Sequence, residues 1–176
     1  MRIPAFVAPI AALSLVACAP SALPTKDYSY PAWGFKAAFP APPSHTPEAG
    51  APDGSAPSSD LVEAAASGRD FAVWTADISK SRMSLEDLAQ SASQHFANGL
   101  SATPGIPAYA ATSEGVMGRE FSFSKNGRWA ATMRVFLAGG RAYEVIGQSQ
   151  YGEDDPAVKE FLFSFHTLGP APAKGS

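Results

Sequence analysis

The stretch EFSFSKNGRWAATMRVFLAGGRAYEVI, residues 120–146, decides the fold of this chain. It is rich in aromatic and β-branched residues, and turn signals at Asn126-Gly127 and Gly139-Gly140 divide it into three segments. Segments of this kind joined by short turns pair as antiparallel strands. The sequence therefore predicts two consecutive hairpins within one sheet.

The register of these hairpins is predicted by requiring that apolar side chains share a face of the sheet. A three-residue loop in the first turn sets Phe123 opposite Trp129, whereas a two-residue turn would mix apolar and polar side chains. The same rule in the second turn sets Arg134 opposite Glu144, a pair of opposite charges. We therefore expect three-residue loops in both hairpins.

Segments upstream of this stretch also have the alternating side-chain pattern of strands. Residues 33–39 place aromatic and other apolar side chains at every second position and end at Pro40, and residues 60–66 and 71–78 flank a turn signal at 67–70. These segments add strands to the predicted sheet.

Two helices are predicted from the 3.6-residue period of apolar side chains. The first has Ser84 as N-cap, Asp87 three residues later and a stop at Asn98-Gly99. Its apolar face consists of Leu85, Leu88, Ala89, Ala92 and Phe96. The second begins at Asp155-Pro156, with Val158, Phe161, Leu162 and Phe165 on one face. The fold class is therefore α+β, with helices packed on an antiparallel sheet.

Residues 1–17 read as a secretory signal peptide, with Arg2 before an apolar stretch too short for a permanent membrane span. The stretch ends in Leu15-Val16-Ala17-Cys18, which resembles the lipobox of bacterial lipoproteins. The resemblance implies that Cys18 is lipidated and becomes the mature N-terminus. Ala19, in place of aspartate, implies sorting to the outer membrane, facing the periplasm. The alternative is an ordinary signal peptide cut beside an incidental cysteine.

The remaining chain is predicted to form one domain. Residues 18–31 are expected to be a lipidated cysteine with a flexible tether, residues 32–168 the domain, and residues 169–176 a flexible tail. Residues 41–59, rich in proline and without an apolar period, are expected to be a long loop inside the domain. Without Arg2 the chain has 12 basic and 16 acidic residues, so its charge argues against nucleic-acid binding.

The order of these elements resembles the PsbP-like (Mog1p/PsbP-like) domains. The resemblance rests on Trp33-Gly34-Phe35-Lys36-Ala37-Ala38-Phe39-Pro40, on Arg141-Ala142-Tyr143-Glu144-Val145, and on Phe161-Leu162-Phe163-Ser164-Phe165. It covers residues 30 to 168 and implies an α/β/α sandwich. It also implies a non-catalytic binding or assembly role, by analogy of fold alone.

Catalytic and metal-binding patterns are weak. His45, His95 and His166 are too far apart in sequence for a paired metal motif, so we expect no metal and no cofactor. Ser122 and Lys125 match the S-x-x-K pattern of some serine hydrolases, but they lie on a predicted strand, where they point to opposite faces.

Two further groups have a structural and a functional interpretation. The carboxylate pairs Glu86/Asp87 and Asp154/Asp155 lie at predicted helix starts, where capping explains them better than acid–base or calcium chemistry. Tryptophans Trp33, Trp74 and Trp129 are expected in the core, although they could line a ligand groove.

The sequence thus predicts a lipid-anchored envelope protein that is not an enzyme and binds a protein or small ligand near residues 41–59. One alternative is an envelope hydrolase whose site forms only in three dimensions, with His95 or His166 as base. Another is a passive spacer or cell-wall-associated module. The partner and the pathway are not predicted.

Overall fold

The computed structural model describes residues 22–50, 57–112 and 114–168. The predicted signal peptide at 1–17, the lipidation site Cys18 and the tail at 169–176 lie outside the described residues. Within the described part, no helix is both long and apolar enough to cross a membrane.

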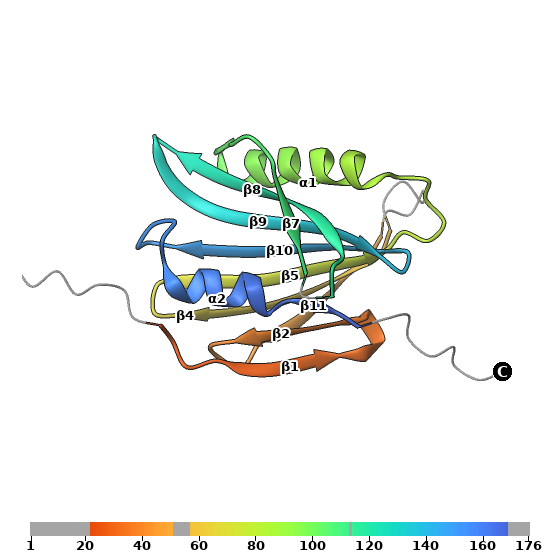
Figure 1. Ribbon diagram of the computed structural model, residues 1–176, viewed down its shortest axis with the longest axis horizontal. Helices are drawn as coiled ribbons and strands as arrows, with labels where there is room; N and C mark the ends of the chain where they lie inside the picture. The colour runs from red at the N-terminus through yellow and green to blue at the C-terminus, as the bar shows by residue number, and fades with distance from the viewer. Residues whose placement is uncertain (1–21, 51–56, 113, 169–176) are drawn as a thin grey trace, which may run out of the picture.

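The described residues form an eight-stranded antiparallel sheet and a smaller three-stranded sheet (Figure 1). In the large sheet the strand order is β3-β4-β5-β10-β9-β8-β6, and β7 also pairs with β8. Its strands are β3 (Ser44–Glu48), β4 (Ser59–Ala66), β5 (Arg69–Asp77), β6 (Thr103–Pro104), β7 (Ala108–Ala111), β8 (Met117–Lys125), β9 (Arg128–Ala138) and β10 (Arg141–Ser149). The small sheet, in the order β1-β2-β11, consists of β1 (Lys26–Tyr30), β2 (Phe35–Phe39) and β11 (His166–Thr167).

Two helices cover opposite faces of the large sheet. Helix α1 (Leu85–Leu100) packs on β6, β8 and β9, whereas α2 (Pro156–Ser164) packs on β5 and β10 and on β2 of the small sheet (Figure 1). One core lies beneath α1 and includes Leu88, Phe123 and Met133, and a second beneath α2 includes Phe35 and Phe161. The predicted α+β fold, with helices on both faces of an antiparallel sheet, is confirmed. The far half of the α1 face, over β3, β4 and β5, has no helix packed on it among the described residues.

The predicted registers of both central hairpins are wrong, that of β8–β9 by one residue at the turn and by two beyond a bulge, and that of β9–β10 by one residue. Lys125 pairs with Arg128 across a two-residue turn, and a bulge at Ala130 then shifts β9 so that Phe123 faces Ala131. The second turn is Gly139-Gly140, both with positive φ, so Glu144 faces Val135 rather than Arg134. Arg134 lies on the opposite face and pairs with Glu120 of β8.

The start of α1 is as predicted, but its end is not. Ser84 accepts a hydrogen bond from the amide of Asp87, and the Asp87 carboxylate accepts one from the amide of Ser84, which completes a capping box. The helix continues through Gly99 and ends at Ser101, whose φ of 52° is left-handed. Gly99 is therefore the next-to-last residue of the helix and not its stop signal.

Two segments predicted to be loose contain strands. Residues 26–30 of the predicted tether form β1, which pairs along its whole length with β2. Residues 44–48 of the predicted loop form β3, the edge strand beside β4. Their polar, exposed sequences hide the period that reveals a strand, because a strand at the edge of a sheet needs few apolar side chains. The short η1 turn (Pro31–Trp33) joins β1 to β2.

Candidate functional site

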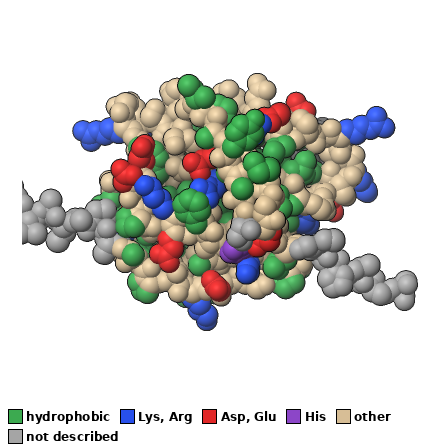
Figure 2. All heavy atoms as spheres, in the orientation of Figure 1, with side chains coloured by type: hydrophobic (Ala, Val, Ile, Leu, Met, Phe, Trp, Pro, Cys, Tyr) green, Lys and Arg blue, Asp and Glu red, His purple; other side chains and the backbone are tan. Residues whose placement is uncertain are grey.

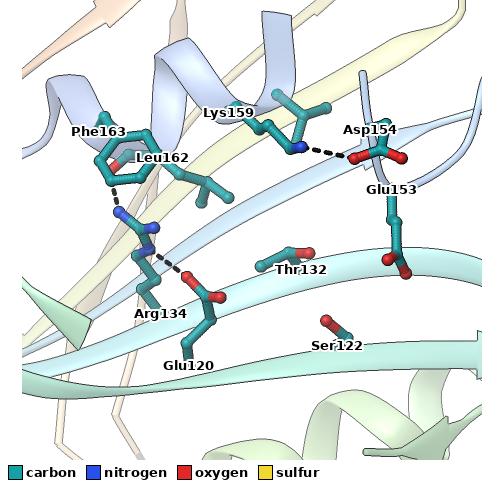
Figure 3. Close-up of a pocket in the computed structure, with 10 residues that line it drawn as sticks. Glu120, Ser122, Thr132, Arg134, Glu153, Asp154, Lys159, Leu162 and Phe163 are labelled. Carbon is teal, nitrogen blue, oxygen red and sulfur yellow. Dashed lines mark hydrogen bonds and ion pairs between the residues drawn. The ribbon is translucent and has the colours of Figure 1, made fainter. Parts of the chain in front are cut away.

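A groove lies between α2 and strands β8 and β9 (Figure 3). Its volume is about 210 Å³. It is lined by Glu120, Ser122, Thr132, Arg134, Glu153, Asp154, Val158, Lys159, Leu162 and Phe163. The side chains from β8 and β9 point toward α2 because the two strands pair Ser122 with Thr132 and Glu120 with Arg134.

Arg134 forms one wall of the groove. Its Nε donates to Glu120 Oε2 at 2.6 Å and its Nη1 donates to the carbonyl of Leu162 at 3.1 Å. The guanidinium also lies 4.3 Å from the centre of the Phe163 ring, a cation–π contact. Arg134 is 7% exposed, so this buried cation is neutralised by Glu120 and fixes the last turn of α2 to the sheet.

Acidic side chains and Lys159 form the other wall. Lys159 Nζ donates to Asp154 Oδ1 at 2.6 Å across the first turn of α2. This hydrogen bond lowers the pKa of Asp154 and raises that of Lys159, so both stay charged over the physiological pH range. On the face that carries α2, acidic and basic side chains are interspersed with hydrophobic ones, without a patch of one sign (Figure 2).

The floor of the groove offers hydroxyl groups. Ser122 is exposed, and the Thr132 hydroxyl accepts a hydrogen bond from Trp129 Nε1 at 3.3 Å. The rim carries Phe163, an apolar ring that is 65% exposed. Hydroxyl groups beside an exposed aromatic ring can hydrogen-bond a polar group whose apolar part packs on the ring. Among the described residues that line the groove, none is histidine or cysteine.

The base of α2 is held by a buried ion pair that the sequence did not predict. Arg69 Nε donates to Asp155 Oδ2 at 2.7 Å, and Ser149 also bonds to this carboxylate. Burial of Asp155 would raise its pKa, but the bonds from Arg69, Ser149 and the Ala157 amide together lower it. Asp155 is thus both the predicted cap of α2 and a charged partner of β5.

The three histidines lie apart from the groove. His45 on β3 is 2.9 Å from Asp60 Oδ1 and packs 4.3 Å from the ring of Trp33. His166 Nδ1 on β11 is 2.8 Å from Glu114 Oε1. Among the described residues, no three metal-binding side chains come together in a cluster.

His95 lies on the exposed face of α1, in an open hollow with Asp87 and Ser91. The spacing resembles a catalytic triad, but the order is wrong, since the histidine of a triad must lie between the serine and the acid. Here Ser91 lies in the middle, and Asp87 and His95 are separated by about 12 Å along the helix axis. Asp87 is also engaged with the N-cap Ser84. This stripe is therefore a solvated helix face.

One member of each carboxylate pair takes part in capping, as predicted, and the other forms an ion pair. Asp87 and Asp155 cap α1 and α2. Glu86 forms a two-pronged ion pair with Arg119 of β8, and Asp154 bonds to Lys159.

Of the remaining candidates, Ser122 lines the groove, but Lys125 and the three tryptophans do not. Ser122 stays on β8 and Lys125 at its end, so the S-x-x-K match has no helical geometry. The tryptophans are half-buried at the margins of both cores and do not share a groove. The groove itself was missed. Its one signal in the sequence is Arg134, a charged residue inside the apolar run of β9.

Comparison with known proteins finds no matching sequence family and no matching curated protein. A solved structure of similar fold is the solution structure of cyanobacterial PsbP (CyanoP) from Synechocystis sp. PCC 6803. The TM-score is 0.56 at 15% sequence identity, and the match covers 92% of this chain and 100% of that chain. At this identity the match establishes the fold. The chain has a PsbP-like α+β fold, as the order of its sequence elements indicated.

Proposed function

We propose that this protein is a non-catalytic binding module of the bacterial envelope, anchored by a lipid on Cys18. Its groove between α2 and strands β8 and β9 receives a protruding polar group of a partner macromolecule. The lipobox-like sequence before Cys18 supports the anchor, and the PsbP-like fold is compatible with a binding role.

The size of the groove supports a macromolecular partner over a metabolite. Pockets for small ligands commonly enclose about 300 to 1,000 Å³. The groove, at about 210 Å³, fits a side chain or one sugar-sized group better than a whole cofactor. A partner would therefore place only part of itself in the groove and make its other contacts around the rim.

The pairing of the charged side chains in the groove is the observation that supports this proposal most directly. Arg134 is already paired with Glu120, and Lys159 with Asp154, so both cations of the groove are neutralised by neighbouring carboxylates, and Glu153 adds an exposed carboxylate at the edge. Ser122, Thr132 and the Phe163 ring are left to contact a ligand. Preorganised walls of this kind favour binding, since little side-chain ordering is needed when the partner arrives.

Site-specific photo-crosslinking in the native bacterium tests the groove. A benzoylphenylalanine at Phe163 should give a discrete crosslinked species on irradiation, because its exposed ring lies at the rim. The matched control places the same probe at Gln94, on the outer face of α1, and should give none. The same probe at Ser122 serves as a second position inside the groove. Absence of a crosslink at both Phe163 and Ser122, or equal crosslinking at Gln94, would refute the groove as the binding site.

One observation favours the hydrolase alternative. The His166 imidazole is held by the carboxylate of Glu114, as the base of a hydrolase is held by its acid. Labelling by a fluorophosphonate probe that is lost in His166→Asn would support this activity. If the wild-type protein is not labelled, serine hydrolase chemistry is excluded.

A further inference from the structure

The uncovered half of the α1 face is a surface distinct from the groove, which opens on the opposite face. Helix α1 packs on β6, β8 and β9 and leaves this half open over β3, β4 and β5, up to the adjoining β10. The strand pairing places fifteen side chains on it. They are Ser44, Thr46, Glu48, Ser59, Leu61, Glu63, Ala65, Asp70, Ala72, Trp74, Ala76, Ala142, Glu144, Ile146 and Gln148. Ser59, Ala76, Ala142 and Ile146 are buried, and the last two belong to the core beneath α1, so the exposed part of this surface lies over β3, β4 and the adjoining positions of β5. We call this surface the open face.

The charges on the open face are all of one sign. Its four ionisable side chains are the carboxylates of Glu48, Glu63, Asp70 and Glu144, and none of its other positions is lysine, arginine or histidine. Three of the carboxylates are exposed, and Glu144 is half-buried. This contrasts with the α2 face, where both signs are interspersed (Figure 2).

Glu144 lacks a neutralising partner among the described residues. It lies between Trp74 of β5 and Val135 of β9, neither of which carries a charge. The charged group that acts on it is Glu48, which has the same sign and is itself held by Trp74 Nε1 at 2.9 Å and by the hydroxyl of Ser59 at 2.6 Å. Burial and then Glu48 raise the pKa of Glu144 to about 7.

Apolar side chains lie between these acids. Leu61 and Trp74 face each other across β4 and β5, and both are half-buried. Further along these strands, an open hollow of about 500 Å³ is lined in part by Glu63, Asp70 and Gln148. The open face therefore combines an aromatic and aliphatic centre with an acidic surround, the composition of a docking surface for a protein of opposite charge.

We infer that the open face docks a lysine- or arginine-bearing segment of a partner protein. Charge complementarity identifies the occupant: nucleic acid and anionic lipid would be repelled by four carboxylates. A cation from the partner would neutralise Glu144, and its aliphatic stem would cover Leu61 and Trp74. This inference does not depend on the groove, and the two can fail separately.

The docking also predicts a pH dependence. Glu144 is mainly protonated at pH 6 and mainly ionised at pH 8, and only the ionised carboxylate attracts a cation. Binding should therefore tighten as the pH rises, and Glu144→Gln should remove most of this change.

Calorimetric titration of the full chain in non-ionic detergent tests the inference, with hexa-arginine as the probe and its neutral counterpart hexa-citrulline as the control. We expect hexa-arginine to bind at low ionic strength and hexa-citrulline not to bind. Glu144→Gln should weaken binding at pH 8 by about threefold or more. The matched variant Asp27→Asn, which removes an exposed acid from β1, should change it less than twofold.

Three outcomes would overturn the inference. They are no binding of hexa-arginine, equal binding of hexa-citrulline, and equal weakening by Asp27→Asn and Glu144→Gln. The last would show attraction to net charge rather than docking on the open face. Because no groove residue is altered, the result is separate from the crosslinking test at Phe163.

Discussion

Single charged residues of this protein differ in whether a neighbour neutralises them. Arg69 with Asp155, and Arg134 with Glu120, are buried or half-buried pairs that fasten α2 to the large sheet. Glu144 is half-buried with only a like charge acting on it. Removing a charge from water without a partner costs free energy, so Glu144 opposes folding wherever it is ionised.

Glu144→Gln should change the pH dependence of stability. The pKa of Glu144 is about 7 in the folded protein and near 4.5 when unperturbed, so between these values the folded state holds a proton that the unfolded state has lost. Its contribution to stability is therefore full below pH 4.5 and is lost as the pH rises through 7. The variant should be more stable than wild type at pH 8 by on the order of 2 kcal/mol, and the gap should close toward pH 4.

Urea unfolding at pH 4, 6 and 8 measures this gap, with Asp27→Asn as the control that should show no comparable trend. A gap that is constant with pH, or that closes toward pH 8, would contradict the assignment. The sequence alone could not identify Glu144 as unusual. The sequence predicted Arg134 as the cross-strand partner of Glu144. The charged residue that acts on Glu144 in the structure, Glu48, lies in a segment that was expected to be a loop.

Elements that were predicted correctly carry local signals, and those predicted wrongly depend on distant partners. The caps at Ser84 and Asp155 follow from residues within three positions of each helix start. The hairpin registers do not. In β9–β10 both strands are apolar on both faces, so a slip of one residue leaves either face plausible, and in β8–β9 the bulge moves the register by a further residue. The bulge at Ala130 likewise has no glycine or proline to mark it.

Gly99→Ala should stabilise the protein, because Gly99 lies inside α1 with open space around it. Alanine reduces the conformational entropy lost on folding, which is worth about 0.5 to 1 kcal/mol in the middle of a helix and less in the last turn, where Gly99 lies. Thermal unfolding measures the effect. As a control, Ser101→Gly should be neutral or mildly stabilising, since Ser101 has the left-handed conformation that glycine favours. Destabilisation by Gly99→Ala would show that the helix stops at Asn98-Gly99 after all.

The whole molecule is an α+β sandwich whose helices lie on opposite faces of the large sheet. The order of its segments, read against the PsbP-like domains, was enough to predict this arrangement. The three-stranded sheet was not predicted, because β1 and β11 are short and polar, and because β11 lies far from its partner β2 in the sequence. The groove could not be predicted either, since its two walls come from segments far apart in sequence.

Cys18→Ser should release the protein from the membrane. Cys18 is the one cysteine of the chain, so metabolic labelling with an alkyne palmitate can report thioether-linked acylation only there. We expect label and membrane fractionation for the wild type and for the control Ser14→Ala, which keeps the cysteine. Cys18→Ser should be unlabelled. An unlabelled wild-type protein in the soluble periplasmic fraction would instead support the ordinary signal peptide.

Strand β1 limits how far the folded domain can lie from Cys18. It is paired from Lys26 onward, and Leu23 before it already packs on the core beneath α2, so the chain from Cys18 to Leu23 spans at most about 18 Å. With the proposed anchor, the domain and a partner in the same membrane would be confined to a thin layer at its surface, where their concentration exceeds that of the same proteins free in solution. A contact that is weak between dilute soluble proteins would then be occupied more often at the membrane.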